Sequence, residues 1–229
     1  MTLQRKSNKI ILYIVLLIIF SSINNFNLKS LKFEKIKNIN ISGLENSHKQ
    51  IILNQIKKLY LENIFFLNGV ELKKILSSNS IIEKYKIFKI YPSTILIDIK
   101  KTNFLAKINK EEKIFLIGSN GKLSNTKLSN IKLPYIFGKP EIKEFLNFKK
   151  TIDDSQISYN RIKKIYYFPS GRWDLELENN ILLKLPKNNI KISLNNFFEF
   201  INHSNFLENK IIDIRIENQI IVNERRSKS

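Results

Sequence analysis

The sequence predicts an α+β protein: one N-terminal transmembrane helix, a small β-α-α-β-β unit, and a β-rich domain whose mixed or antiparallel sheet carries two helices. Three observations predict it. The run Ile10–Phe20 is entirely apolar, residues 36–103 place helical patterns between strand patterns, and residues 104–224 hold many short strand patterns separated by turns. Because 43% of the 229 residues are hydrophobic, the chain can bury real cores, which argues against intrinsic disorder.

The apolar run is predicted to form a membrane-spanning helix over residues 10–26. Residues 21–26 can extend Ile10–Phe20 toward the roughly 17 to 20 residues that a span needs. A cleaved signal peptide would need small residues at its cleavage site, and Phe20–Asn24 offers no Ala-x-Ala-like site. A buried helix of a globular protein would normally carry a polar stripe. We therefore favour an uncleaved signal anchor over these two alternatives.

Basic residues around this helix favour a cytoplasmic N-terminus. Arg5, Lys6 and Lys9 crowd residues 1–9, the predicted cytoplasmic tail. Lysines also follow the helix, in and beyond a predicted tether at residues 27–35, but they lie farther from the apolar run. Since long domains translocate largely regardless of their charge, the rest of the chain is expected outside the cytoplasm.

The net charge of +19 raises the possibility of nucleic-acid binding, but the lysines are scattered along every segment instead of forming one stripe. Attraction to anionic lipid headgroups is a second possibility. The interpretation we favour is that lysine abundance follows from a composition rich in Ile, Lys and Asn. The absence of cysteine excludes disulfides, thiolate catalysis and cysteine metal sites.

Residues 36–103 alternate between strand and helix patterns. Ile95, Ile97 and Ile99 give the cleanest alternation in the chain, and Ser47–Gln50 has the form of a helix capping box. The expected elements are a strand at 36–42, a helix after Ser47, a second helix after Asn68, and strands at Ile81–Ile90 and Thr94–Lys101.

Residues 104–224 are expected to form the second domain, followed by a disordered basic tail at residues 225–229. Gly118–Gly121 is a predicted hairpin turn, because glycine and asparagine tolerate positive φ. The expected strands are 104–108, 114–117, 161–168, 172–178, 181–185, 211–216 and 219–223, and the expected helices are 141–150 and 192–201.

The order of elements in residues 36–103 resembles that of a POTRA module, and local phrases resemble the bacterial cell-division FtsQ (DivIB) family. The phrases are Ile39-x-Ile41-x-Gly43, Asn63-Ile64-Phe65, Tyr91-Pro92, Pro134-x-x-x-Gly138, Arg172-Trp173-Asp174-Leu175, Leu185-Pro186 and Asp213-x-Arg215. The chain departs from the family at Gly118, where an Asp is usual, and at Lys101-Thr102-Asn103, where a Glu and a Pro are usual.

The resemblance implies a single-pass inner-membrane protein of the division septum, with most of its mass in the periplasm. It implies a non-enzymatic divisome scaffold that links early and late division proteins and binds FtsB- and FtsL-type partners through its C-terminal strand. The matching residues are Gln219, Ile220, Ile221, Val222 and Asn223. Asp213 and Arg215, two apart and hence on one face of a strand, are expected to help position that strand. The POTRA module is expected to contact other divisome proteins.

Catalytic patterns are absent from the sequence. His48 and His203 have no plausible partner nearby in sequence, Ser119 has no evident activating base, and Asp153-Asp154 lacks further clustered oxygen ligands. We therefore expect no catalytic residues, no cofactor, no metal, no small-molecule substrate and no nucleic acid. Trp173 is expected in the core, with a partner-facing anchor as the alternative.

Two other functions stay open at this point. A POTRA-bearing component of polypeptide export or envelope assembly is the first, but no closing set of amphipathic barrel strands follows the single POTRA-like unit. A nucleic-acid-binding membrane protein is the second, and it would need a cytoplasmic C-terminal region with a clustered basic face.

Overall fold

The computed structural model describes residues 3–22, 35–59, 63–65, 67, 69–126, 132–202, 208 and 210–225, without the side chains of residues 3–8 and 22. The predicted tether up to residue 34, the cap residue Asn68, His203 and the tail at 226–229 lie outside the described residues.

The first helix, α1, runs from Leu3 to Ser22, and the side chains from Ile10 to Phe20 are all exposed. It begins before the predicted span at 10–26 and therefore includes the basic residues of the predicted tail. None of the helices in the described part of the chain is both long enough and apolar enough to cross a membrane.

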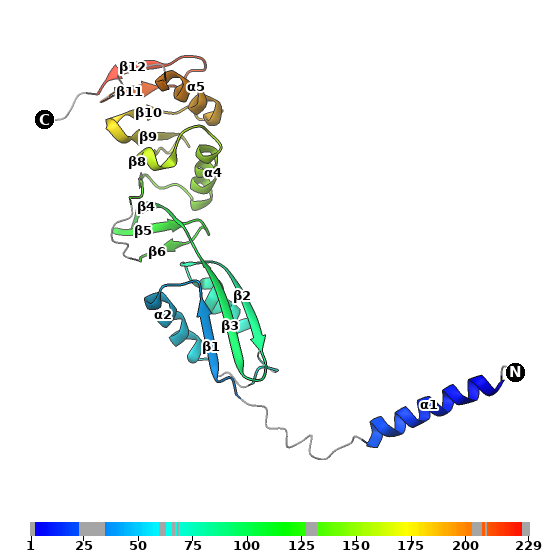
Figure 1. Ribbon diagram of the computed structural model, residues 1–229. Coiled ribbons are helices and arrows are strands. Elements are labelled where there is room, and N and C mark those ends of the chain that lie inside the picture. Colours follow the sequence, from blue (N-terminus) through cyan, green and yellow to red (C-terminus); the bar gives the residue numbers. More distant parts are fainter. Residues whose placement is uncertain are drawn as a thin grey trace.

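The β-α-α-β-β unit forms as expected, in a three-stranded sheet with two helices on one face (Figure 1). The strand order is β1-β3-β2, with β1 parallel and β2 antiparallel to the central β3. The elements are β1 Asn38–Ser42, α2 Asn46–Lys57, α3 Gly69–Ser78, β2 Ile82–Ile90 and β3 Thr94–Lys101.

The alternation of β3 explains this unit. Ile95, Ile97 and Ile99 are at most 3% exposed and pack against Ile52 of α2 and Leu72 of α3. Asp98 and Lys100, on the opposite face of β3, are exposed. One face of β3 therefore lies at the centre of the core that the sheet forms with the two helices.

The start of α2 differs from the prediction. The helix begins at Asn46, with Glu45 at the N-cap making no side-chain capping bond, so the predicted box at Ser47–Gln50 is wrong. Glu45 instead receives the amide N–H of Lys49 on its backbone carbonyl at 2.9 Å. Its carboxylate accepts a 2.5 Å bond from Lys101, which holds the helix start against the end of β3.

The C-terminal domain is built on a nine-stranded mixed sheet in the order β12-β11-β10-β9-β8-β7-β4-β5-β6. The pairs β4/β7, β7/β8 and β10/β11 are parallel and the other pairs are antiparallel. The strands are β4 Phe104–Lys110, β5 Lys113–Gly118, β6 Leu123–Ser124, β7 Tyr135–Phe137, β8 Ile162–Tyr167, β9 Trp173–Leu177, β10 Leu182–Lys184, β11 Lys210–Asp213 and β12 Ile221–Glu224.

Two helices, α4 Ile142–Asp153 and α5 Ile190–Asn202, pack against this sheet and complete its core. Trp173 of β9 is 5% exposed and stacks on Phe148 of α4 with ring centroids 4.4 Å apart. Its predicted place in the core is confirmed, and the alternative of a partner-facing anchor is wrong. Glu141 caps α4 in a reciprocal box with Glu144.

A polar network joins the two domains at the turn after β5. Ser119 Oγ and Thr102 Oγ1 both donate to Glu83 of β2, at 2.8 and 3.0 Å. Asn120 donates from its amide to the backbone carbonyls of Ser80 and Ile82. A Cβ at Gly118 would lie 2.9 Å from Thr102 Oγ1. The two family departures, at Thr102 and Gly118, therefore lie next to each other at the junction.

Candidate partner-binding edge

The last strand, β12, lies at one edge of the nine-stranded sheet. It pairs antiparallel with β11 alone, with Ile221 opposite Asp213 and Val222 opposite Ile212. An edge strand presents a row of backbone N–H and C=O groups on its outer side, and another chain can pair with them. All four residues of β12 are exposed in the structure.

Two apolar side chains stand on opposite faces of this edge. Ile221 is 43% exposed and Val222 is 40% exposed. Val222 pairs with Ile212, which is completely buried beneath α5, whereas Ile221 lies on the face that carries Asp213. A strand added along β12 would therefore find an apolar contact on each face of the sheet.

The strand begins two residues later than the sequence predicts. Gln219 lies in the preceding turn, where its backbone N–H donates to the carbonyl of Ile216 at 3.2 Å. Ile220 packs, partly buried, against the core of the domain. Of the predicted partner-binding residues, the structure thus places Ile221, Val222 and Asn223 on the edge strand and uses Ile220 to seat it.

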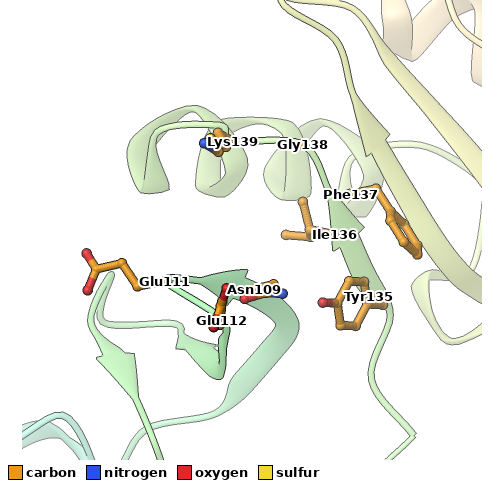
Figure 2. Close-up of a pocket in the computed structure, with 8 residues that line it drawn as sticks. All are labelled: Asn109, Glu111, Glu112, Tyr135, Ile136, Phe137, Gly138 and Lys139. Atoms are coloured by element: carbon orange, nitrogen blue, oxygen red, sulfur yellow. The ribbon is translucent and has the colours of Figure 1, made fainter.

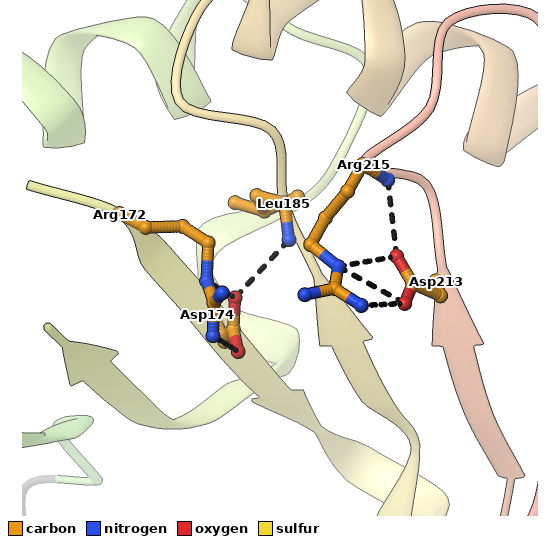
Figure 3. Close-up of polar contacts among 5 residues, drawn as sticks. All are labelled: Arg172, Asp174, Leu185, Asp213 and Arg215. Atoms are coloured by element: carbon orange, nitrogen blue, oxygen red, sulfur yellow. Dashed lines mark hydrogen bonds and ion pairs between the residues drawn. The ribbon is translucent and has the colours of Figure 1, made fainter. Parts of the chain in front are cut away.

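Asp213 and Arg215 meet at the end of β11, as Figure 3 shows. Arg215 donates from Nη2 to Asp213 Oδ2 at 2.5 Å and from Nε to Oδ1 at 2.8 Å. These bonds from Arg215 hold the pKa of Asp213 below its usual value. Because β11 ends at Asp213, Arg215 is not in the same strand, and the prediction that the two residues share one face of one strand is wrong. The bonds between Arg215 and Asp213 instead hold the chain in a turn where it leaves the sheet after β11.

A second carboxylate lies beside this pair, on β9 (Figure 3). Asp174 accepts the backbone N–H of Leu185 at 3.2 Å and the Nε of Arg172 at 3.2 Å. Its burial, at 3% exposure, raises its pKa despite the nearby charge of Arg172. Asp174 thereby ties the end of β10 to β9.

Glu176, also on β9, fastens the other end of β12. Arg225, directly after the strand, donates from Nη2 to Glu176 Oε2 at 3.0 Å and from Nη1 to the carbonyl of Asn180 at 3.1 Å. Lys164 and Tyr166 donate to the same carboxylate at 3.0 and 2.8 Å. Burial, together with the bond to Glu176, raises the pKa of Tyr166 to about 12.

No local pattern in the sequence predicts the contact between Arg225 and Glu176. Arg225 follows the last strand pattern in a basic segment, so the sequence predicts it as part of the disordered tail. Its partner is 49 residues away. A hint in the sequence is that Glu176 lies between two apolar residues, Leu175 and Leu177. If its carboxylate is buried there, it needs a cationic partner.

A hollow of about 460 Å³ lies elsewhere on the domain, between the β4–β5 hairpin and the end of β7 (Figure 2). Its lining includes Tyr135, Ile136 and Phe137, together with Glu111 and Glu112 of the hairpin turn. Figure 2 shows the Glu111 carboxylate at the hairpin tip, well separated from Tyr135. Among the described residues, no group of three or more His, Asp or Glu side chains gathers as a metal site.

Comparison with known proteins identifies both domains. Residues 34–101 match the family model described as POTRA domain, FtsQ-type, and residues 106–215 match the model described as Cell division protein FtsQ/DivIB, C-terminal. The second match includes Asp213 and Arg215 and ends before β12.

Whole-chain relatives carry the same description. The chain is 25% identical over 192 residues to the cell division protein FtsQ of Rickettsia bellii (strain RML369-C). The aligned region covers 82% of this chain and 72% of that protein. It is 22% identical over 191 residues to FtsQ of Rhizobium meliloti (strain 1021), covering 82% of this chain and 62% of the relative.

Among solved structures, the major extracytoplasmic domain of the division protein DivIB from Geobacillus stearothermophilus aligns with 41% of this chain and 85% of its own, at 14% identity and a TM-score of 0.32. The two family models between them match most of the chain, in the order in which its two domains occur. The resemblance in the sequence is thereby confirmed: this chain belongs to the FtsQ/DivIB family of cell-division proteins.

Proposed function

We propose that the chain is a non-enzymatic scaffold of the divisome, anchored in the inner membrane by α1, with a cytoplasmic N-terminus and both domains in the periplasm. In this proposal it links early and late division proteins by binding FtsB- and FtsL-type partners along β12, while the POTRA domain meets other divisome proteins. Family membership supports a role in division. The basic residues before Ile10–Phe20 support the orientation.

The observation that carries the binding proposal is the outer edge of β12, with Ile221 and Val222 exposed on opposite faces of one strand. Strand addition at such an edge takes affinity from backbone hydrogen bonds and specificity from alternate side chains. A partner segment of β-branched or aromatic residues, able to extend beside β12, has the chemistry that this edge recognises.

The strand is also held in place before any partner arrives. Before the strand, Arg215 bonds to Asp213 at the end of β11. Directly after the strand, Arg225 bonds to Glu176 of β9. A preorganised edge avoids part of the ordering cost of association. The same residues therefore serve stability in the free protein and affinity in the proposed complex.

The experiment that tests the cellular role is the localisation of two fusions. A fluorophore that matures outside the cytoplasm, fused to the C-terminus, should give a band at midcell in dividing cells. A cytoplasmic-only fluorophore at the same position should stay dark. An even peripheral signal would contradict the division role. Fluorescence from the cytoplasmic fluorophore alone would contradict the proposed orientation.

A further inference from the structure

Four exposed apolar side chains gather at one end of the POTRA domain, around the turn between β2 and β3. Phe88 and Ile90 end β2, Tyr91 begins the turn, and Phe65 comes from the segment between α2 and α3. Their exposed fractions are 46, 47, 58 and 54%. The rings of Phe65 and Tyr91 lie 4.9 Å apart, which joins the two segments. We call these four residues the POTRA tip.

Exposed lysines surround the POTRA tip. Lys89 lies between Phe88 and Ile90 in the sequence. Lys37 precedes β1, and its backbone N–H donates to the carbonyl of Ser93, in the turn between β2 and β3, at 2.9 Å. Lys35 pairs with Asn63, two residues before Phe65. In residues 35–38 and 88–94 every charged side chain is a lysine. The end of the domain therefore combines aromatic surface with positive charge.

This end of the domain is also the one that the chain enters from α1 (Figure 1). β1 begins here, with Asn38 opposite Thr94, and β3 leads away toward the C-terminal domain. Twelve residues separate Ser22 from Lys35. A chain of that length spans at most about 45 Å, which bounds the distance between the end of α1 and the start of the POTRA domain.

We propose that the POTRA tip contacts the anionic surface of the bilayer that holds α1. The inference rests on the membrane anchoring proposed above. Aromatic side chains favour the headgroup region, where a ring meets both apolar and polar surroundings. Lysines are attracted to anionic lipids within about one Debye length, roughly 8 Å at physiological salt. The contact sets the domain upright on the membrane and directs β12 away from it.

The absence of cysteine makes a direct test possible, because one introduced thiol can carry a fluorophore. Asn38→Cys places the label at the tip end, on an exposed residue outside the POTRA tip. Ser78→Cys, on an exposed residue at the end of α3 near the C-terminal domain, is the matched control. The full chain is reconstituted in vesicles of phosphatidylglycerol and phosphatidylcholine that contain headgroup-nitroxide lipid, and quenching is measured at both sites.

We expect several-fold stronger quenching at Asn38→Cys than at Ser78→Cys, and a decrease when phosphatidylglycerol is omitted. Adding Phe65→Ser and Tyr91→Ser should remove most of the difference. Ile51→Ser, which changes a side chain of 56% exposure on α2, should leave it unchanged. Equal quenching at the two labelled sites overturns the inference, as does a tip contact that survives the double substitution.

Flotation of the same vesicles separates this inference from the anchoring on which it rests. A chain that floats with the vesicles but shows no preferential quenching at Asn38→Cys retains its anchor and lacks the tip contact. A chain that remains at the bottom of the gradient contradicts the anchor itself, and the tip contact with it.

Discussion

Arg225 and Glu176 form a 3.0 Å ion pair that ties the end of the edge strand to the centre of the sheet. The Glu176 side chain is 5% exposed, so the charge of Arg225 meets a carboxylate that is largely withdrawn from water. The loss of one donor to a buried charged group costs more than the loss of an exposed pair. The edge strand is therefore fastened by an interaction that its own sequence does not reveal.

The first prediction concerns this pair. Arg225→Ala should weaken the attachment of β12 by about 1 to 2 kcal/mol, the usual worth of a hydrogen bond to a charged group. Hydrogen exchange at the β12 amides that bond inward to β11 should then accelerate by roughly tenfold, because their protection depends on local opening. Mass spectrometry of peptides from the last strand measures this directly.

Lys210→Ala is the control for that prediction. Lys210 pairs with Glu224 at 3.1 Å, but the Glu224 side chain is 88% exposed, and such pairs contribute little. Exchange in β12 should stay close to that of the unchanged chain. Equal acceleration in the two variants would show that net positive charge, and not the bond to Glu176, holds the strand.

The second prediction concerns the outer edge of β12 in partner binding. Successive N–H groups of a strand point to opposite edges, so one of Ile221 and Val222 donates inward to β11 and the other outward. Proline removes the donor at its own position. Ile221→Pro and Val222→Pro should both weaken binding of the periplasmic segment of an FtsB-type protein by tenfold or more.

The two proline variants should differ in stability. The variant at the inward position loses a ladder bond and lowers the free energy of unfolding, while the variant at the outward position leaves it almost unchanged. Isothermal titration and urea unfolding of both chains resolve the two effects. Full affinity in the variant that remains stable would contradict strand addition along this edge.

The third prediction concerns the core. Trp173→Ala should lower the free energy of unfolding by about 3 to 5 kcal/mol, because it opens a large cavity against Phe148. Trp173→Phe keeps an aromatic ring there and should cost less than half as much. Urea unfolding of the two variants gives the values. A cost below 1 kcal/mol for Trp173→Ala would place the side chain outside the cooperative core.

Elements that depend on local alternation could be predicted from the sequence, and contacts over long separations could not. The strand Thr94–Lys101 has the predicted bounds because one of its faces is buried along its whole length. The start of β12 differs from the prediction because Ile220 and Ile221 are both apolar, and no sequence pattern separates the core residue from the strand. The hydrogen bond at Gln219, which closes the turn, marks that boundary in the structure. The role of Arg225 is not predictable from the sequence because its partner, Glu176, lies three strands away in the sheet.

The fourth prediction concerns pH. Bonds from Arg215 lower the folded-state pKa of Asp213 below the unfolded value of about 3.9. The pair therefore contributes stability that is fully present above the unfolded pKa and is lost as pH falls through the folded pKa. Because Arg215 is 42% exposed, that contribution should stay near or below about 1 kcal/mol.

Asp213→Asn measures the contribution. The variant should be less stable than the unchanged chain at pH 7. The difference should shrink as pH falls below the unfolded pKa and through the lowered folded-state pKa of Asp213. Urea midpoints over this range give the curve. A difference that stays constant with pH would assign the effect of the substitution to packing or to the hydrogen bonds that asparagine retains.

The fifth prediction concerns the junction between the domains. Asn120 donates to the carbonyls of Ser80 and Ile82 at 3.0 and 2.9 Å, and Lys122 bonds to the carbonyls of Ser77 and Asn79. Asn120→Ala leaves two backbone acceptors without a side-chain donor and should weaken the docking of the domains by about 1 to 3 kcal/mol.

The measurement is the distance distribution between spin labels placed on the two domains, in the otherwise cysteine-free chain. The unchanged junction should give one narrow distribution, since Asn120, Ser119 and Thr102 fix the turn from several sides. Asn120→Ala should broaden it, whereas Asn109→Ala, on an exposed residue of β4 away from the junction, should not. A narrow distribution in both variants would mean that Glu83, with its two hydroxyl donors, is sufficient to hold the domains together.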